Sequence, residues 1–309
     1  MRNQPECFKD HVTTPTPPIC NYEDSSYQTD FWDQGGRVYE DQAEAIALRR
    51  LLPKGGEQLL ELGAGAGRNT PRYIGYKKVV LLDYSLTQLQ HARTRLGQDE
   101  RYTYVAADIY RLPFVDGLFD GATMIRTLHH MAEPALALRQ VRRTLQPGAI
   151  FILEFANKHN LKAIFRYLIR KQSWSPFSHQ SVEFEKLNFD FHPQAIKGWL
   201  ADTDFAVQQQ LAVSYFRLGI FKRFLPIKML VILESWLQPT GQWFQFSPSV
   251  FSRCLAVNDT PVAQPGSFFK CPVCASANLE GHENHLLCPG CSANWPIQDG
   301  VYDFRVKTS

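Results

Sequence analysis

Short apolar runs alternate with amphipathic segments along the first half of the chain. The apolar runs have the length of strands and cover residues 58–62, 78–82, 102–106, 119–125 and 149–155. Segments with a helical period precede or separate them, one ending at residue 52 and the others covering residues 67–76, 86–96 and 133–145. Strands that alternate with helices predict an α/β fold with a doubly wound, mostly parallel sheet covered on both faces.

The pattern changes after the fifth apolar run. A long helical and aromatic insertion follows, about residues 158–240, with residues 207–213 as its strand candidate, and it predicts the wall of a substrate site. Residues 241–257 predict a final pair of strands. The predicted units are an N-terminal arm and substrate-side segment (1–35), a main domain (36–257), a linker rich in proline and small polar residues (258–267) and a small C-terminal domain (268–309).

Composition favours a globular protein that stays in the cytoplasm. The 309 residues are 44% hydrophobic, which is enough for a large core. Thirty-three basic and 30 acidic residues give a net charge of +3, too balanced to mark the whole chain as a nucleic-acid binder. Residues 1–26 lack the apolar core of a secretory signal, and no apolar run reaches the length of a membrane span. We therefore expect a cytoplasmic protein.

A glycine-rich sequence follows the first predicted strand. Residues 61–67 read Glu-Leu-Gly-Ala-Gly-Ala-Gly and open a helix, so backbone amides there approach a ligand closely. A dinucleotide-binding loop would require glycine where the chain has Arg68. Asp83 ends the second strand, where a carboxylate accepts the hydroxyls of a ribose, and Asp108 with Ile109 ends the third, where a carboxylate accepts the amine of adenine. The second aspartate favours an adenosyl cofactor, although both aspartates could instead cap helices.

These motifs occur in the order found in a known family. They are residues 61–67, Asp83, residues 108–114, Phe119-Asp120, Leu128-His129-His130 and residues 145–148. Together they resemble class I S-adenosylmethionine-dependent methyltransferases, above all the small-molecule branch that contains the ubiquinone and menaquinone C-methyltransferases. The resemblance covers residues 36–156 and implies a Rossmann-like fold with a seven-stranded sheet.

The resemblance also implies which residues bind S-adenosylmethionine. It implies Gly63, Gly65 and Gly67 near the methionine moiety, Asp83 on the ribose, and Asp108 with Ile109 on the adenine. We further expect cofactor contacts from Glu61, Ala64, Tyr84 and Arg126.

Methyl transfer from a sulfonium is an in-line displacement, so the protein mainly aligns the reactants and needs a base only if the nucleophile arrives protonated. Candidates for that base are His129 and His130 after the fourth strand and Tyr27 in the arm, while Tyr39, Phe31 and His179 are candidates for the substrate side. The histidines could equally serve packing or helix capping. Arg126-Thr127-Leu128 replaces the Asn/Asp-Pro-Pro-aromatic motif of amino methylators, and no Pro-Cys nucleophile occurs, so adenine N6 and cytosine C5 methylation are not expected.

Residues 216–237 alternate basic and apolar side chains at roughly helical spacing. Such a stripe is usually part of a core. The alternatives are a lid over an apolar pocket, a site for an amphiphilic substrate, or a segment that lies on a membrane surface.

Four cysteines near the C-terminus predict a structural zinc site. Cys271 and Cys274 form one Cys-x-x-Cys pair, Cys288 and Cys291 form another, and the thirteen residues between the pairs match a zinc ribbon. Four thiolates leave no open coordination position, so we expect a structural ion. Free or disulfide-bonded cysteines are the alternative.

The same tail contains a second motif. Residues 294–301 resemble the Tyr-Pro-Ile…Asp-Gly-Ile pattern of the small zinc-binding activator subunit of RNA and protein-release-factor methyltransferases, with Trp295 and Val301 as substitutions. That subunit stabilises a methyltransferase by docking against it, which implies a similar role for the tail within one chain.

The sequence therefore predicts a methyltransferase that uses S-adenosylmethionine, acts on a small apolar or aromatic molecule, and carries structural zinc. An RNA or protein methyltransferase is one rival, favoured by the activator-like tail and by the basic side chains of Arg217, Lys222, Arg223 and Lys228. A scaffold protein that binds the cofactor without turnover is another. Oligomeric state is left open.

Overall fold

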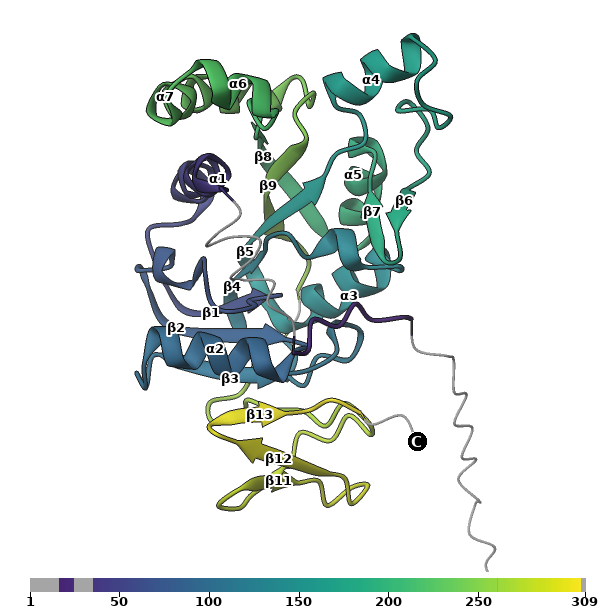
Figure 1. Ribbon diagram of the computed structural model, residues 1–309. Coiled ribbons are helices and arrows are strands. Elements are labelled where there is room, and N and C mark those ends of the chain that lie inside the picture. The colour runs from purple at the N-terminus through teal and green to yellow at the C-terminus, as the bar shows by residue number, and fades with distance from the viewer. Residues whose placement is uncertain (1–16, 25–35, 260, 307–309) are drawn as a thin grey trace, which may run out of the picture.

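The computed structural model describes residues 17–24, 36–259 and 261–306. In this part of the chain, a central sheet has seven strands in the order β3-β2-β1-β4-β5-β9-β8 (Figure 1). Strands β1 to β5 pair in parallel, while β9 and β8 pair antiparallel at one side. The fold is thus the predicted Rossmann-like, mostly parallel sheet. The strands are β1 (Gly56–Leu62), β2 (Tyr76–Asp83), β3 (Tyr102–Ala106), β4 (Phe119–Met124), β5 (Leu145–Ala156), β8 (Phe205–Val213) and β9 (Ser249–Ala256).

Alternate residues of the strands pack against helices on opposite faces of the sheet, because successive strand side chains point in opposite directions. Leu60 of β1 shares a buried cluster with Leu138 and Ile196, whereas its neighbour Leu59 shares another with Leu89. Helices α3 and α5 therefore cover one face, and α2 covers the other together with α1. These helices are α1 (Val38–Leu51), α2 (Leu86–Leu96), α3 (Pro134–Thr144) and α5 (Pro193–Asp202).

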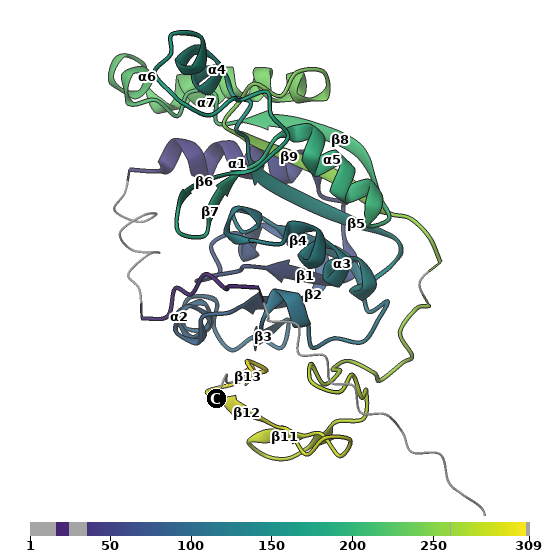
Figure 2. The same ribbon diagram turned by 90° about the vertical axis from the view of Figure 1, so that its right-hand side faces the viewer.

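The insertion after β5 builds one end of the molecule. Both views place α4, α6 and α7 together at the end opposite the C-terminal tail (Figures 1 and 2). None of the helices among the described residues is long and apolar enough to cross a bilayer. The elements of the insertion, besides α5 and β8, are α4 (Leu161–Leu168), β6 (Val182–Glu185), β7 (Asn188–Asp190), α6 (Gly219–Phe224), α7 (Ile227–Leu237) and the short helix η5 (Gln238–Gln242).

The C-terminal tail continues the central sheet. Strand β13 pairs in parallel with β3, and the backbone N–H of Phe304 donates to the carbonyl of Ala106 at 2.7 Å. Phe304 and Trp295 belong to the same buried cluster as residues of the parallel strands. The tail thus shares the main core. Its strands are β10 (Glu280–Gly281), β11 (His285–Leu287), β12 (Asn294–Gln298) and β13 (Val301–Asp303), which bring the sheet to eleven strands.

Two sequence expectations about secondary structure are wrong, and one element was not predicted. Residues 67–76 form only the short helix η2 (Thr70–Arg72), because Gly67 at φ +70° is not helical and Tyr76 already begins β2. Residues 241–257 supply one strand instead of a pair, since η5 occupies the beginning of that range. The insertion contains the unexpected hairpin β6–β7, whose tight turn places Leu187 at φ +57°.

Candidate functional site

The glycine loop after β1 takes backbone conformations that favour glycine. Gly63, Gly65 and Gly67 have φ of +67°, +52° and +70°. A Cβ on Gly63 would overlap the side chain of Thr127, and one on Gly67 would press on Leu96. A Cβ on Gly65 would meet no protein atom within 4 Å. Packing thus accounts for two glycines, while the third leaves open space above the loop for a ligand.

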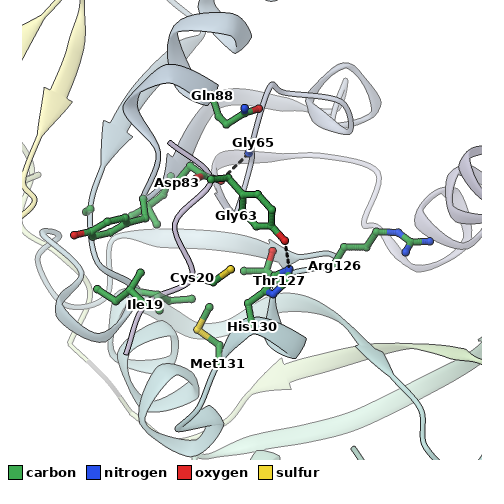
Figure 3. Close-up of a pocket in the computed structure, with 15 residues that line it drawn as sticks. Ile19, Cys20, Gly63, Gly65, Asp83, Gln88, Arg126, Thr127, His130 and Met131 are labelled. Atoms are coloured by element: carbon green, nitrogen blue, oxygen red, sulfur yellow. Dashed lines mark hydrogen bonds between the residues drawn. The ribbon is translucent and has the colours of Figure 1, made fainter. Parts of the chain in front are cut away.

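Asp83 holds this loop against the end of β2. Its carboxylate accepts hydrogen bonds from the backbone N–H of Gly65 at 2.8 Å and of Ser85 at 2.9 Å (Figure 3). Burial raises the pKa of Asp83 above its ordinary value. Ser85, rather than Asp83, caps helix α2, since its hydroxyl accepts from the N–H of Gln88. The helix-cap alternative therefore does not describe Asp83.

A pocket lies above the glycine loop at the carboxyl ends of β1, β2 and β4 (Figure 3). Its empty volume is about 740 Å³, including the part open to solvent. Among residues predicted for the site, those that line it are Gly63, Gly65, Asp83, Tyr84, Ile109, Arg126 and His130. Lining residues that were not predicted are Ile19, Cys20, Tyr22, Leu82, Gln88, Ala107, Thr127 and Met131.

A smaller polar pocket adjoins the first one and is lined by Glu61, Ala64, Arg68 and other loop residues. Glu61 is buried and accepts hydrogen bonds from the hydroxyls of Thr70 at 2.6 Å and Tyr73 at 3.2 Å. Burial raises the pKa of Glu61 to about 7. This carboxyl therefore changes charge near neutral pH and would favour a cationic group beside it.

Arg126 lies at the rim of both pockets, with its side chain turned toward α1 (Figure 3). Its Nε donates to Glu44 at 2.5 Å, and its backbone N–H donates to Glu154 at 2.8 Å. Glu44 also accepts from Arg68 at 2.6 Å. The guanidinium thus belongs to an ion-pair network with α1, so the backbone of Arg126 is what faces the pocket.

His130 and Tyr22 meet on the pocket wall. The Tyr22 hydroxyl and His130 Nε2 are 3.0 Å apart (Figure 3). His130 Nδ1 is 3.0 Å from the carbonyl oxygen of Leu187. A carbonyl only accepts, so Nδ1 carries the proton and Nε2 is left as an acceptor. Burial lowers the pKa of His130 below its ordinary value, which keeps the ring neutral at pH 7.

Several predicted residues lie elsewhere. Asp108 caps the short helix η3 (Ile109–Arg111) by accepting from the N–H of Tyr110, and it is not among the residues of the pocket wall. Its contact with adenine stays a prediction. His129 packs on His130, and burial lowers its pKa well below the ordinary value. Gly67, as noted, packs on α2.

The predicted substrate-side residues do not gather at this pocket. The Tyr39 hydroxyl donates to Glu234 at 2.5 Å between α1 and α7, and this side chain is fully buried, so it is structural here. His179 packs against His192 in the insertion. Tyr27 and Phe31, predicted as a base candidate and a substrate-side residue, lie outside the described residues.

Residues 17–24, which we call the N-terminal strap, supply the pocket residues that sequence reasoning missed. Ile19, Cys20 and Tyr22 reach the wall although more than sixty positions separate them from Asp83. Neither periodicity nor a motif marks this segment. Only its apolar Ile19 and aromatic Tyr22 within a polar arm gave a signal.

The four tail cysteines converge on one point. Their Sγ atoms all lie within 4.8 Å of one another, with 3.7 Å between Cys271 and Cys291 and 3.4 Å between Cys274 and Cys288. Thiolates at about 2.3 Å from a tetrahedral zinc would be about 3.8 Å apart. A disulfide would need about 2 Å, and these cysteines are free. The donor set fits a zinc ion.

Comparison with known proteins gives one family match. A model described as "Methyltransferase domain" matches residues 60–153. The chain is 30% identical over 165 residues to demethylmenaquinone methyltransferase of Clavibacter sepedonicus, covering 52% of this chain and 67% of that protein. It is also 30% identical over 135 residues to O-methyltransferase cnsE of Penicillium expansum, covering 40% of this chain and 48% of that protein. The chain thus spans two thirds of the first relative and about half of the second.

A solved structure shares the fold. The complex between the Haloferax volcanii Trm112 methyltransferase activator and a methyltransferase aligns with a TM-score of 0.54 at 16% identity, over 75% of this chain and 96% of that one. At this identity the likeness concerns the fold alone.

Proposed function

The chain belongs to the class I S-adenosylmethionine-dependent methyltransferases, and from this premise we propose that its substrate is a small apolar or aromatic molecule. The observation that carries the proposal is the pocket beside the glycine loop, to whose wall Ile19 and Met131 contribute apolar side chains. Relatives named for demethylmenaquinone and for O-methylation support the same substrate class. Such a wall favours burial of an aromatic ring over a charged polymer.

The residues of the loop suit S-adenosylmethionine, which when bound supplies a methyl group on a positively charged sulfur. Gly65 leaves room for close approach, and Asp83 offers carboxylate oxygens at the end of β2. Glu61 in the adjoining pocket would attract the ammonium of the methionine moiety. Ile109 supplies an apolar contact for the adenine.

His130 is the residue we propose as proton acceptor. Its Nε2 accepts from the hydroxyl of Tyr22, which also lines the pocket, and its Nδ1–H is fixed by the Leu187 carbonyl. With the cofactor bound, a substrate oxygen or carbon would gain the methyl group as the bond from the methyl carbon to sulfur breaks, which leaves S-adenosylhomocysteine. His130 would take up the substrate's proton at Nε2, directly or through Tyr22. Apolar burial keeps His130 neutral and therefore able to accept.

The test is methyl transfer from cofactor labelled in the methyl group. Purified protein is offered reduced naphthoquinones and simple phenols in parallel with bulk RNA and a mixture of unmodified proteins. We expect label in one of the small aromatic acceptors, and none with Asp83→Ala, whose affinity for S-adenosylhomocysteine should fall at least tenfold, about 1.4 kcal/mol. Label only in RNA or protein would overturn the proposed substrate class.

The rival RNA or protein substrate has weaker support from the basic residues named for it. Lys222 is half-buried and ion-paired with Glu40 at 2.7 Å. Arg217, Arg223 and Lys228 are exposed. Three exposed cations give little support for a continuous basic surface at the pocket mouth.

For the tail, we propose one structural zinc ion on Cys271, Cys274, Cys288 and Cys291. Its role would be to stabilise the methyltransferase core of the same chain. The pairing of β13 with β3 supports this, as does the packing of Phe269 on Phe114 at 6.0 Å between ring centres. Zinc with four thiolates would act in folding, with no step in catalysis.

A further inference from the structure

Helices α4, α6 and α7 present large apolar side chains to solvent. The exposed fraction reaches 73% for Phe224 of α6, 72% for Trp236 of α7 and 62% for Phe165 of α4. The only buried side chains of α7 are those of Leu230 and Glu234, and α6 has none. Most of the apolar side chains of α6 and α7 therefore lie outside the core. We call the exposed apolar side chains of α4, α6 and α7 the apolar end. Besides Phe165, Phe224 and Trp236, its members are Leu161, Leu168, Ile220, Met229 and Ile232.

Three helices from separate parts of the chain contribute to this surface. Both views place α4, α6 and α7 at the same end of the molecule, and Figure 1 shows α4 set apart from the pair α6 and α7 (Figures 1 and 2). Helix α4 is strongly amphipathic, with only Ala163 buried. Single exposed apolar side chains are ordinary on a protein surface. Many of them on three helices at one end of the molecule are not, and such a gathering marks an interaction site.

Cations surround the apolar end, and carboxylates are nearly absent from the segments that build it. Residues 155–182 and 205–258 together carry ten lysines and arginines but only one acid, the buried Glu234. Their net charge of +9 compares with +3 for the whole chain, so the remainder carries −6. The exposed cations of the two segments that have neither an ion pair nor a side-chain hydrogen bond are Lys162, Arg166, Arg170, Lys171, Arg217, Arg223 and Lys228.

From this arrangement we propose that the apolar end docks on the surface of an anionic lipid bilayer. Apolar and aromatic side chains flanked by lysine and arginine suit the boundary between headgroups and acyl chains. The opposite charge of the rest of the molecule would orient this end toward the lipid. A second copy of the chain is a poorer partner, because a two-fold interface would bring the same unpaired cations face to face.

The experiment is flotation of the full chain with vesicles of phosphatidylcholine, with and without phosphatidylglycerol. The double variants Phe224→Ser with Trp236→Ser, and Arg223→Gln with Lys228→Gln, alter only exposed side chains of the apolar end. Ile74→Ser is the matched apolar control, since Ile74 is 83% exposed in the turn before β2. Lys54→Gln with Lys78→Gln is the matched charge control, since both lysines are exposed away from the insertion.

We expect the parent chain and both controls to float with phosphatidylglycerol vesicles. Both apolar-end variants should bind at least tenfold more weakly, and added salt should release the parent. The proposal is overturned if the parent does not float, or if the controls lose binding as much as the apolar-end variants. It is also overturned if light scattering shows a dimer that Phe224→Ser with Trp236→Ser converts to a monomer while vesicle binding is absent. Because vesicle binding requires no methyl transfer, the outcome is independent of the proposed substrate.

Discussion

Glu23 of the strap and Arg305 of the tail form an ion pair at 2.9 Å beside the pocket. The two oxygens of Glu23 also accept from the backbone N–H groups of Leu86 and Thr87, at 3.0 Å each, in the first turn of α2. Arg305 is in turn held by Asp303 of β13 at 2.8 Å. The N-terminal and C-terminal segments thus meet at the helix that follows Asp83.

Removing the charge of Glu23 should loosen the strap and weaken cofactor binding. In Glu23→Gln the ion pair is lost, and the negative charge at the positive end of the α2 dipole is lost with it, for about 0.5–2 kcal/mol together. We expect a several-fold lower affinity for S-adenosylhomocysteine by calorimetry, since Ile19, Cys20 and Tyr22 line the pocket.

The neighbouring Asp24 provides the matched control. Its backbone N–H donates to Thr87, and no described hydrogen bond or ion pair uses its side chain, so Asp24→Asn should bind like the parent. Equal affinity in Glu23→Gln and the parent would show that the strap does not contribute to the cofactor site.

The parallel core could be predicted closely because its signals are local. The apolar run at residues 102–106 coincides with β3, and the helical period at residues 86–96 coincides with α2. Periodicity could not predict that β13 joins β3, because nothing in either strand specifies a partner about two hundred positions away. We therefore predicted the tail as a separate small domain, whereas in the structure its strand β13 belongs to the main sheet.

The candidate site likewise contains residues that local sequence signals identified and residues that they missed. Gly63, Gly65 and Asp83 were identified because a strand-loop-helix unit brings them together along the sequence. Tyr22 was missed because it meets His130 only through the three-dimensional path of the strap. Asp108 has the position that the motif requires, but one of its carboxylate oxygens accepts from the N–H of Tyr110. The sequence does not reveal this hydrogen bond.

Glu61 should make both stability and cofactor affinity depend on pH. Its pKa is raised from 4.5 in the unfolded chain to about 7 by burial. Stability from this group is therefore complete below pH 4.5 and is lost as the pH rises through 7. A bound ammonium favours the ionised carboxylate, so affinity for the cofactor should rise over the same interval.

The measurement is the thermal midpoint and the dissociation constant of S-adenosylhomocysteine between about pH 5 and 8, for the parent and Glu61→Gln. We expect Glu61→Gln to lose much of both pH dependences and to bind at least tenfold more weakly at pH 8. Glu57→Gln, in the same strand with its side chain 73% exposed, should behave like the parent. Unchanged pH profiles in Glu61→Gln would contradict the assignment.

His130 should control the rate more than the binding of substrate. If Nε2 accepts a proton, His130→Gln should lower kcat by a factor of about 10²–10⁴ with KM nearly unchanged. Burial lowers the pKa of His130. On acidification, kcat/KM of the parent should therefore stay constant over the pH range in which an ordinary histidine titrates and should fall only at lower pH. Tyr22→Phe keeps the ring and removes the hydroxyl. It therefore shows whether the substrate's proton reaches His130 directly or through the Tyr22 hydroxyl. A variant His130→Gln with parental kcat would assign the histidine to packing.

The last prediction concerns the metal. Zinc should hold the tail together, because residues 268–306 have only short strands and depend on the cysteines for a fixed turn arrangement. Elemental analysis should find one zinc per chain, and Cys271→Ser with Cys288→Ser should remove it. Loss of zinc should expose the tail to proteolysis after Gln264 and lower the thermal midpoint of the whole chain, because Phe304 and Trp295 share the main core.

The consequence for the cofactor follows from the same contacts. Once β13 separates from β3, Arg305 no longer reaches Glu23, so S-adenosylhomocysteine should bind several-fold more weakly while the glycine loop itself persists. Cys254→Ala is the control, since it removes a buried cysteine of β9 outside the cluster and should keep the metal. A native chain without metal, whose four tail cysteines all titrate as free thiols, would refute the zinc site. A zinc-free variant with an unchanged midpoint would refute its structural role, because a tail that shares the core and pairs with β3 cannot loosen without a cost to the sheet.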